Sequence, residues 1–167
     1  NPTTNQGINI GSFSGDVYCL GIYNGDLIAG GNFYSIKGVA VNSIARWDGS
    51  KWYDIGGGVT GSTHIVYSLK EYKGELYAAG TFDKAGNIDT WNIARWNGSN
   101  WNQVGGIGSD QNNANHSGAN INALAVFKNS LYAAGDYDIM CGISTKLAFW
   151  NGINWAGTNF SRYDIRQ

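Results

Sequence analysis

The sequence predicts an all-β protein made of three copies of one four-stranded antiparallel unit. Three observations lead to this fold class: an internal repeat of 49 to 55 residues, Asn-Gly or Asp-Gly pairs between short apolar segments, and an unusual composition. The 167 residues include 25 Gly, 20 Asn, 7 Trp and 10 Tyr, and only 14% are charged. Gly and Asn tolerate positive φ in tight turns, and Trp and Tyr favour half-buried sheets. The length is that of one domain, expected to span residues 1–167.

The repeat is visible when three stretches of sequence are aligned. They are residues 17–31 (VYCLGIYNGDLIAGG), 66–80 (VYSLKEYKGELYAAG) and 121–135 (INALAVFKNSLYAAG). A second block follows each stretch and reads SIARWDGSKW, NIARWNGSNW and KLAFWNGINW in turn. The copies are therefore expected at residues 16–64, 65–118 and 119–167.

Each copy is expected to contain four strands, two tight turns and one longer loop. The first turn is predicted at Asn24-Gly25, Lys73-Gly74 and Asn129-Ser130, and the second at Asp48-Gly49, Asn97-Gly98 and Asn151-Gly152. Asn-Gly between extended apolar segments predicts a type I′ hairpin, because both central residues need positive φ. The fourth strand is expected to begin at Trp52, Trp101 or Trp155. No segment shows a sustained period of 3.6 residues, so no long helix is predicted.

A four-stranded meander repeated at this length is typical of a β-propeller blade. The pattern L-x-A-G-G-x-F followed by I-A-R-W-x-G-x-x-W also resembles the kelch-like propeller repeats of secreted and cell-surface proteins, especially large bacterial surface proteins. The resemblance covers about residues 17–155 and implies an extracellular or cell-surface location, with adhesion, glycan binding or scaffolding as roles. Some larger members of the family are enzymes. The third copy departs from the pattern, because Phe149 replaces the arginine and the Gly-rich segment after Trp155 is missing.

Three blades are too few to close a propeller, which typically has about four to eight. Open edges with unpaired N–H and C=O groups invite pairing with another chain. Residues 7–15 (GINIGSFSG) resemble the end of a fourth strand in residues 52–61, so residues 1–15 are expected to add an extra fourth-strand segment. The chain would then be part of a larger propeller, half of a two-chain ring, or one subunit of a filament. A β-trefoil, which also has three four-stranded repeats, is the alternative fold.

Charge, hydropathy and cysteine content exclude several classes of protein. The net charge is -1 and no basic cluster occurs, so no nucleic-acid partner is expected. No stretch approaches the ~18 apolar residues of a membrane span, so no membrane insertion is expected. The first residue is Asn rather than Met, which indicates a removed leader or a piece of a longer chain. Cys19 and Cys141 are expected to be free thiols, with a disulfide as the alternative.

The sequence predicts no catalytic residue, no metal ligand and no cofactor. It contains neither H-E-x-x-H nor G-x-S-x-G, and the glycine run at residues 56–58 leads to no helix or lysine. Its acidic residues Asp26, Asp48 and Glu75 fall at repeat turns and are expected to be structural, as are the repeated Arg46 and Arg95. The protein is therefore not expected to be an enzyme.

Candidate binding residues lie at positions that differ between the copies or fall in the long loops. Trp91 has Asn42 and Thr145 as counterparts, so its indole is a candidate platform for a sugar ring, with local packing as the alternative. The long loops, expected to gather on one face, are 34–41, 56–64, 83–90, 106–120 and 138–145. In the longest of them, Asp110, Asn112 and Asn113 are the candidate ligand-binding residues.

Three N-x-S/T sequons supply candidate glycosylation sites. They are Asn97, Asn115 and Asn159. Chance alone gives roughly 2.5 sequons for this content of Asn, Ser and Thr, so the number carries no weight. Asn97 falls in a predicted hairpin turn and Asn115 in the longest predicted loop, both positions where exposure is expected.

Three functions follow, in order of support. The first is a secreted, non-enzymatic structural or assembly module that uses its open sheet edges for self-association or for joining further blades. The second is a lectin-like module that binds glycans through Trp91 and the long loops. The third is a fragment of a propeller enzyme, which requires the rest of the ring.

Overall fold

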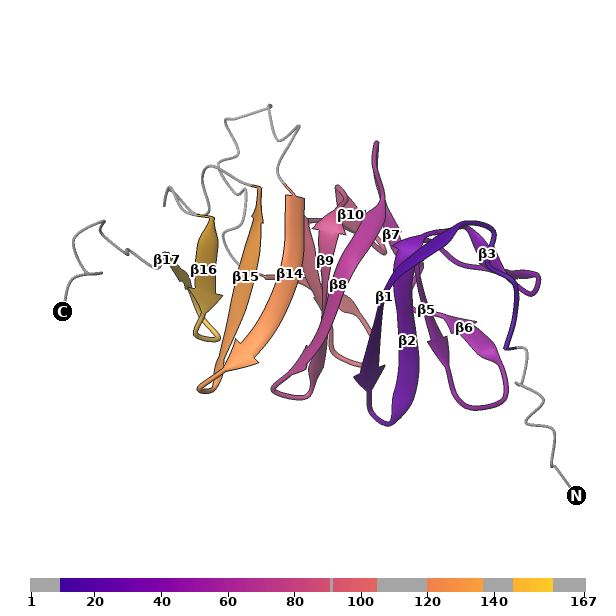
Figure 1. The fold of residues 1–167 in the computed structure, drawn as a ribbon, viewed down its shortest axis with the longest axis horizontal. Helices are drawn as coiled ribbons and strands as arrows, with labels where there is room; N and C mark the ends of the chain where they lie inside the picture. The colour runs from indigo at the N-terminus through magenta and orange to yellow at the C-terminus, as the bar shows by residue number, and fades with distance from the viewer. Residues whose placement is uncertain (1–9, 91, 105–119, 137–145, 158–167) are drawn as a thin grey trace, which may run out of the picture.

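A computed structural model describes residues 10–90, 92–104, 120–136 and 146–157 of the chain (Figure 1). All regular structure in these residues is β-strand, and they contain no helix. The predicted all-β class is therefore confirmed.

Three four-stranded antiparallel sheets, here called the first, second and third units, follow one another along the chain (Figure 1). The first unit contains, in spatial order, β1 (Asp16–Tyr23), β2 (Asp26–Asn32), β5 (Ile44–Trp47) and β6 (Trp52–Asp54). The second contains β8 (Ile65–Tyr72), β9 (Glu75–Thr81), β12 (Ile93–Trp96) and β13 (Trp101–Gln103). The third contains β14 (Asn120–Phe127), β15 (Ser130–Asp136), β16 (Leu147–Trp150) and β17 (Trp155–Gly157).

Two short hairpins occupy segments that the sequence predicts as loops. They consist of β3 (Ser35–Ile36) with β4 (Val39–Ala40), and β10 (Lys84–Ala85) with β11 (Ile88–Asp89). Strand β7 (Val59–Thr60), which follows the first unit, pairs with β10 of the second-unit hairpin. The prediction of plain loops at residues 34–41 and 83–90 is therefore wrong. Two-residue strands are too short to show the alternation by which strands are recognised in sequence.

The first turn of each unit has the predicted geometry, with one correction of position. Both central residues have positive φ in the turns at Asn24-Gly25 and Lys73-Gly74, as a type I′ turn requires. In the third unit Phe127 pairs with Ser130, so the turn is Lys128-Asn129 and not Asn129-Ser130. Asparagine tolerates the left-handed region, and here it takes the place that glycine has in the other two turns.

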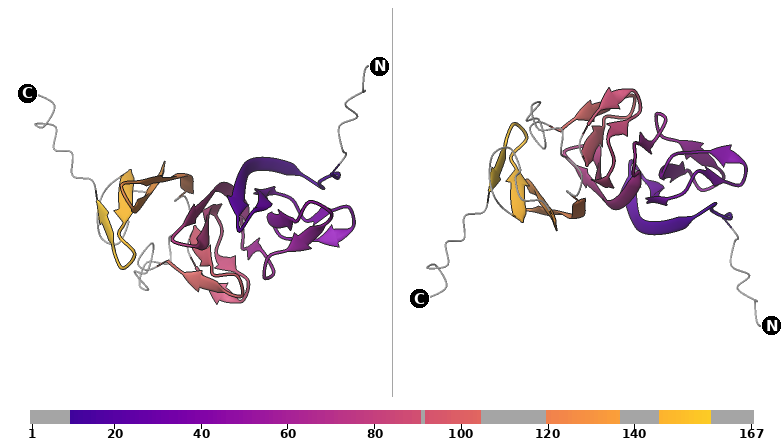
Figure 2. Two further views of the ribbon diagram at one scale, coloured as in Figure 1. Left: turned by 90° about the horizontal axis from the view of Figure 1, so that it is seen from below. Right: turned by 90° about the horizontal axis from the view of Figure 1, so that it is seen from above.

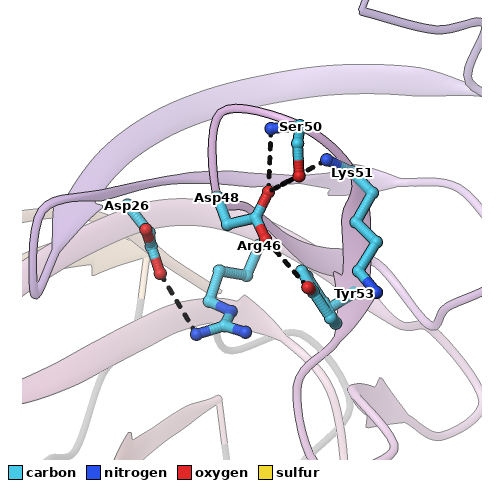
Figure 3. Close-up of polar contacts among 6 residues, drawn as sticks. All are labelled: Asp26, Arg46, Asp48, Ser50, Lys51 and Tyr53. Atoms are coloured by element: carbon cyan, nitrogen blue, oxygen red, sulfur yellow. Dashed lines mark hydrogen bonds and ion pairs between the residues drawn. The ribbon is translucent and has the colours of Figure 1, made fainter.

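The second turn is a four-residue connection rather than the predicted two-residue turn. Trp47 pairs with Trp52, which leaves residues 48–51 in the loop, and only Gly49 among them has positive φ. The Asp48 carboxylate closes the loop by accepting hydrogen bonds from the backbone N–H groups of Ser50 (2.8 Å) and Lys51 (2.9 Å) (Figure 3). The side chains of Asn97 and Asn151 accept the equivalent bonds in the other units. In each unit an Asp or Asn side chain thus stabilises a four-residue connection where the sequence predicts a two-residue turn.

A repeated glycine allows a β-bulge between the first two strands of each unit. The pairing register shifts between Val66 and Ser68, and a Cβ atom at Gly80 would lie only 1.9 Å from the carbonyl oxygen of Ile65. Gly31 and Gly135 have the same close approach in their units. The glycine that ends each copy of the A-G-G or A-A-G motif is therefore needed for backbone contact.

Two of the three buried hydrophobic clusters of the described residues lie between neighbouring units, and the third lies between the first unit, its hairpin and residues 10–13. One buried cluster combines Ile28 and Ile44 of the first unit with Leu69 and Ala78 of the second. Another joins residues of the second and third units, among them Tyr77 and Leu131. The sheets therefore pack face to face in chain order, from the indigo end to the yellow end of Figure 2.

Candidate functional site

The contact between first strands shows how one unit covers the next. A Cβ atom at Gly21 would lie 3.1 Å from the Cβ atom of Leu69, so the missing side chain makes room for this leucine. Leu69 is only 7% exposed. The side of each unit that contacts the preceding unit is here called the leading face, and the side that contacts the following unit is called the trailing face.

A tyrosine at the end of the first strand connects each unit to the next. The Tyr23 hydroxyl donates a hydrogen bond to the carbonyl oxygen of Gly74 (3.4 Å), and the Tyr72 hydroxyl donates to that of Asn129 (2.8 Å). Burial raises the pKa of Tyr23, so the donor stays protonated. Both acceptors lie in the first turn of the following unit.

A tryptophan at the start of the fourth strand makes a connection in the opposite direction. The Trp101 indole N–H donates to the carbonyl oxygen of Ile55 (2.8 Å), which follows the fourth strand of the first unit. In the first unit, Trp52 donates to the carbonyl oxygen of Ile10 (2.7 Å), and Phe13 packs against Trp52. Ile10 and Phe13 therefore make contacts with the first unit that correspond to those that residues 55–59 make with the second unit. Both belong to the predicted extra segment at residues 1–15.

The leading face of the first unit is exposed where its counterparts are buried. Leu20, Leu69 and Leu124 occupy equivalent positions in the three first strands. Leu69 and Leu124 lie against the preceding unit and are 7% and 9% exposed, whereas Leu20 is 62% exposed. Equivalent side chains differ in this way because the first unit has no preceding unit among the described residues.

The trailing face of the third unit shows the same contrast. Tyr23 and Tyr72 are 5% and 3% exposed, whereas their counterpart Phe127 is 58% exposed. The ring of Tyr132 lies 6.2 Å from that of Phe127 and 5.8 Å from that of Phe149. This trailing face therefore carries three neighbouring aromatic rings.

The third unit also lacks the ion pair found on the other trailing faces. Arg46 pairs with Asp26 at 3.1 Å (Figure 3), and Arg95 pairs with Glu75 at 2.7 Å. The third unit has Phe149 and Ser130 at these two positions. An aromatic residue thus replaces the cation on the one trailing face that no described unit covers.

Most of the sequence-predicted binding residues lie outside the described part of the chain. These are Trp91, Asp110, Asn112, Asn113, Asn115 and Asn159, together with Cys141. Among the candidate glycosylation sites, Asn97 is described and exposed at the start of the second turn. Its side-chain oxygen accepts hydrogen bonds from the backbone N–H groups of Ser99 and Asn100 at 3.0 and 2.8 Å.

Several titratable side chains that the sequence marks as repeated or unusual have structural partners or are partly buried. The half-buried Cys19 thiol contacts the carbonyl oxygen of Val66 at 3.7 Å, and burial raises the pKa of this thiol to about 12. Such a thiol stays protonated at neutral pH and is a poor nucleophile. The carboxyl groups of Asp26 and Glu75 face arginines, and Asp48 closes a turn. In the described ranges, no group of three or more His, Cys, Asp or Glu side chains is placed to hold a metal ion.

Comparison with known proteins adds no relative from which a role can be transferred. Within the described ranges, no helix has the length and apolar character needed to cross a membrane. No family model matches the chain, and no curated protein matches its sequence.

Proposed function

We propose that the chain is a non-enzymatic assembly module of three kelch-like β-propeller blades that joins copies of itself head to tail. The observation that carries the proposal is the exposure of Leu20 and Phe127 at the two ends of a stack in which every equivalent side chain is buried. In this arrangement the leading face of one copy covers the trailing face of another.

The separation of the three sheets supports blades over a β-trefoil. Each four-stranded unit is a separate sheet whose strands pair only with one another, and the units meet through their faces. Beyond these sheets, the ladder between β7 and β10 connects the tail of one unit to the hairpin of the next. A trefoil instead requires strands of all three repeats to share one barrel.

The large exposed apolar side chains that support the proposal lie on sheet faces, so association is proposed through these faces in place of the strand edges that the sequence suggests. On the leading face of the first unit, Ile10 and Phe13 already take the positions that the tail of a preceding unit would fill. The uncovered part is the first strand around Leu20. A second copy can cover it without displacing any described segment.

The interfaces within the chain indicate which residues would meet. Leu69 packs against Gly21, so Leu20 would pack against Ala125, the counterpart of Gly21 in the third unit of another copy. Tyr23 reaches the turn at Gly74, so Phe127 would reach the turn that contains Gly25. Full burial of one leucine or phenylalanine contributes about 1.5–3 kcal/mol, so these two contacts supply a substantial part of a weak association.

A charge at position 20 tests the proposal, and position 22 supplies a matched control. Ile22 is exposed, but so are its counterparts Glu71 and Val126, so its exposure indicates no missing neighbour. Leu20→Glu should abolish association in sedimentation equilibrium, whereas Ile22→Glu should leave it unchanged. A wild-type chain that stays monomeric at high concentration, or equal effects of both variants, would contradict the proposal.

The other two functions that the sequence raises have less support. The lectin-like function was placed on Trp91, Asp110, Asn112 and Asn113, all outside the described residues. The enzyme fragment would need an acidic cluster contributed by further blades. An extracellular or cell-surface location remains part of the proposal and follows from the resemblance to kelch-like repeats.

A further inference from the structure

A surface pocket of about 340 Å³ lies where the tail of the first unit meets the second unit. Two indoles form its aromatic corner: Trp96 and Trp101 have ring centroids 5.5 Å apart and planes inclined by 56°. Asn87, Ser99 and Asn100 line the polar side. None of the described residues that line the pocket has a charged side chain.

Two glycines bring the backbone close to both indoles. A Cβ atom at Gly56 would lie 2.4 Å from the ring of Trp96, and one at Gly86 would lie 3.1 Å from the ring of Trp101. Both glycines have positive φ, at 58° and 54°. Any larger residue would be strained there and would intrude on the indoles, so the pocket depends on glycine at both positions.

The equivalent place in the first unit has a lysine where the second unit has a glycine. Lys37 is the counterpart of Gly86, and its Cγ and Cδ atoms would lie 3.1 and 3.3 Å from a Cβ atom at Gly11, the counterpart of Gly56. The lysine stem thus lies close to the backbone at Gly11. The second unit has no side chain at the corresponding position, because Gly86 stands there.

Polar groups in the pocket are available for a ligand. The side chains of Asn87 and Asn100 make no hydrogen bond with any described residue, and both are exposed. The counterpart of Ser99 is Ser50, whose hydroxyl donates to Asp48 at 2.7 Å. In the second unit Asn97 replaces this carboxylate, and the Ser99 hydroxyl makes no such bond within the described residues.

We propose that this pocket binds an uncharged sugar ring of a glycan. The apolar C–H face of a pyranose complements an indole, and its hydroxyl groups complement amide and hydroxyl side chains. The volume lies within the roughly 300–1,000 Å³ typical of small-molecule sites. The absence of charged lining residues favours a neutral sugar over an acidic or phosphorylated one. The site differs from the one predicted around Trp91, and it involves neither Leu20 nor Phe127.

The binding test uses the indole N–H resonances of the ¹⁵N-labelled full chain. The probes are methyl glycosides of glucose, galactose, mannose and N-acetylglucosamine. At least one probe should shift the Trp96 and Trp101 resonances in a saturable manner. If no probe shifts them up to its solubility limit, the proposal is overturned.

Matched variants show whether this pocket is responsible for the binding. Trp96→Phe should weaken binding several-fold, whereas Trp47→Phe, the same change at the equivalent position of the first unit, should leave it unchanged. Asn87→Ala and Asn100→Ala should each weaken it about fivefold, the factor expected for one lost hydrogen bond. Equal effects at Trp47 and Trp96, or no effect of either alanine variant, would overturn the assignment.

The variant Leu20→Glu tests whether the pocket and the proposed association surface are independent. Leu20→Glu should abolish association and leave glycoside binding unchanged, because Leu20 does not line the pocket. Loss of glycoside binding in Leu20→Glu would contradict the independence of the two sites.

Discussion

The hydroxyl group of Tyr72 connects the second unit to the third through a side-chain hydrogen bond. It donates to the carbonyl oxygen of Asn129 at 2.8 Å, and its ring is almost fully buried against the ring of Tyr77. The counterpart bond from Tyr23 is longer, at 3.4 Å, and the third unit has Phe127, which has no hydroxyl group. This hydrogen bond is therefore shorter between the second and third units than between the first and second, and the third unit has no hydroxyl group with which to make it.

Removing the two tyrosine hydroxyls separately should show this difference. Tyr72→Phe should lower the free energy of unfolding by about 1 kcal/mol, because the carbonyl oxygen of Asn129 loses its donor. Tyr23→Phe should cost less, because its hydrogen bond is longer. Urea denaturation followed by tryptophan fluorescence measures both. A larger loss in Tyr23→Phe than in Tyr72→Phe would contradict the geometry described above.

At the residue scale, the sequence identified side-chain roles but not their backbone partners. The repeat marked Trp52, Trp101 and Trp155 as structural, and all three are buried. It did not indicate that Trp101 donates to the carbonyl oxygen of Ile55, because a backbone acceptor leaves no trace in the sequence. The sequence shows that Phe149 stands where the other copies have arginine. Only the structure shows that this residue lies on an exposed trailing face.

The second turn of the first unit is stabilised mainly by hydrogen bonds to a single side chain. Asp48 accepts hydrogen bonds from two backbone N–H groups, from the Ser50 hydroxyl and from the Tyr53 hydroxyl at 2.8 Å (Figure 3). The Lys51 backbone N–H and the Ser50 hydroxyl together hold the pKa of Asp48 well below its usual range. The equivalent turns use Asn97 and Asn151, which have no proton to gain.

Asp48→Asn should remove the acid sensitivity of this turn while keeping its shape. Because the folded pKa of Asp48 is lowered, the charged form stabilises the turn above the ordinary aspartate pKa of about 3.9. That stabilisation is lost progressively as the pH falls below this value. The stability of the variant relative to wild type should therefore rise as the pH falls from 5 to about 2. Thermal unfolding across this range measures the difference, and parallel curves would contradict the prediction.

At the scale of elements, turns that contain glycine could be located from the sequence, whereas a turn without glycine and the two-residue strands could not. Asn24-Gly25 and Lys73-Gly74 were placed correctly because glycine at positive φ marks them. The third turn was misplaced by one residue because Lys128-Asn129 contains no glycine. The hairpins at β3–β4 and β10–β11 were missed because each strand has two residues and its pairing depends on contacts distant in sequence.

For the whole molecule, the repeated sequence predicts the similarity of the units but not the surroundings of each unit. Three copies with the same strand order follow from the repeat, and the three four-stranded sheets agree with it. The repeat could not show which faces are bare, because Leu20, Leu69 and Leu124 look identical in sequence and differ only in what lies next to them. The proposed pocket was also hidden from the sequence, since it depends on Lys37 and Gly86 facing equivalent backbone positions.

Mixing two variants should distinguish head-to-tail association from a symmetric dimer. Leu20→Glu blocks the leading face, and Phe127→Asp blocks the trailing face, so neither variant alone should form an interface. An equimolar mixture should contain heterodimers and nothing larger, because only one intact face remains on each chain. Sedimentation velocity measures the masses. Dimers of either variant by itself would contradict the head-to-tail arrangement.

The indole bond from Trp101 to Ile55 and the ladder between β7 and β10 have a consequence for how the chain can be cut. The residues that repeat in sequence and the residues that fold together do not have the same boundaries, because the tail of the first copy is anchored in the second unit. A single-copy peptide that begins at Ile65 would leave the Trp101 indole N–H without an acceptor. One that begins before Ile55 would retain that acceptor, so the shortest autonomous fragment should start upstream of the apparent repeat boundary.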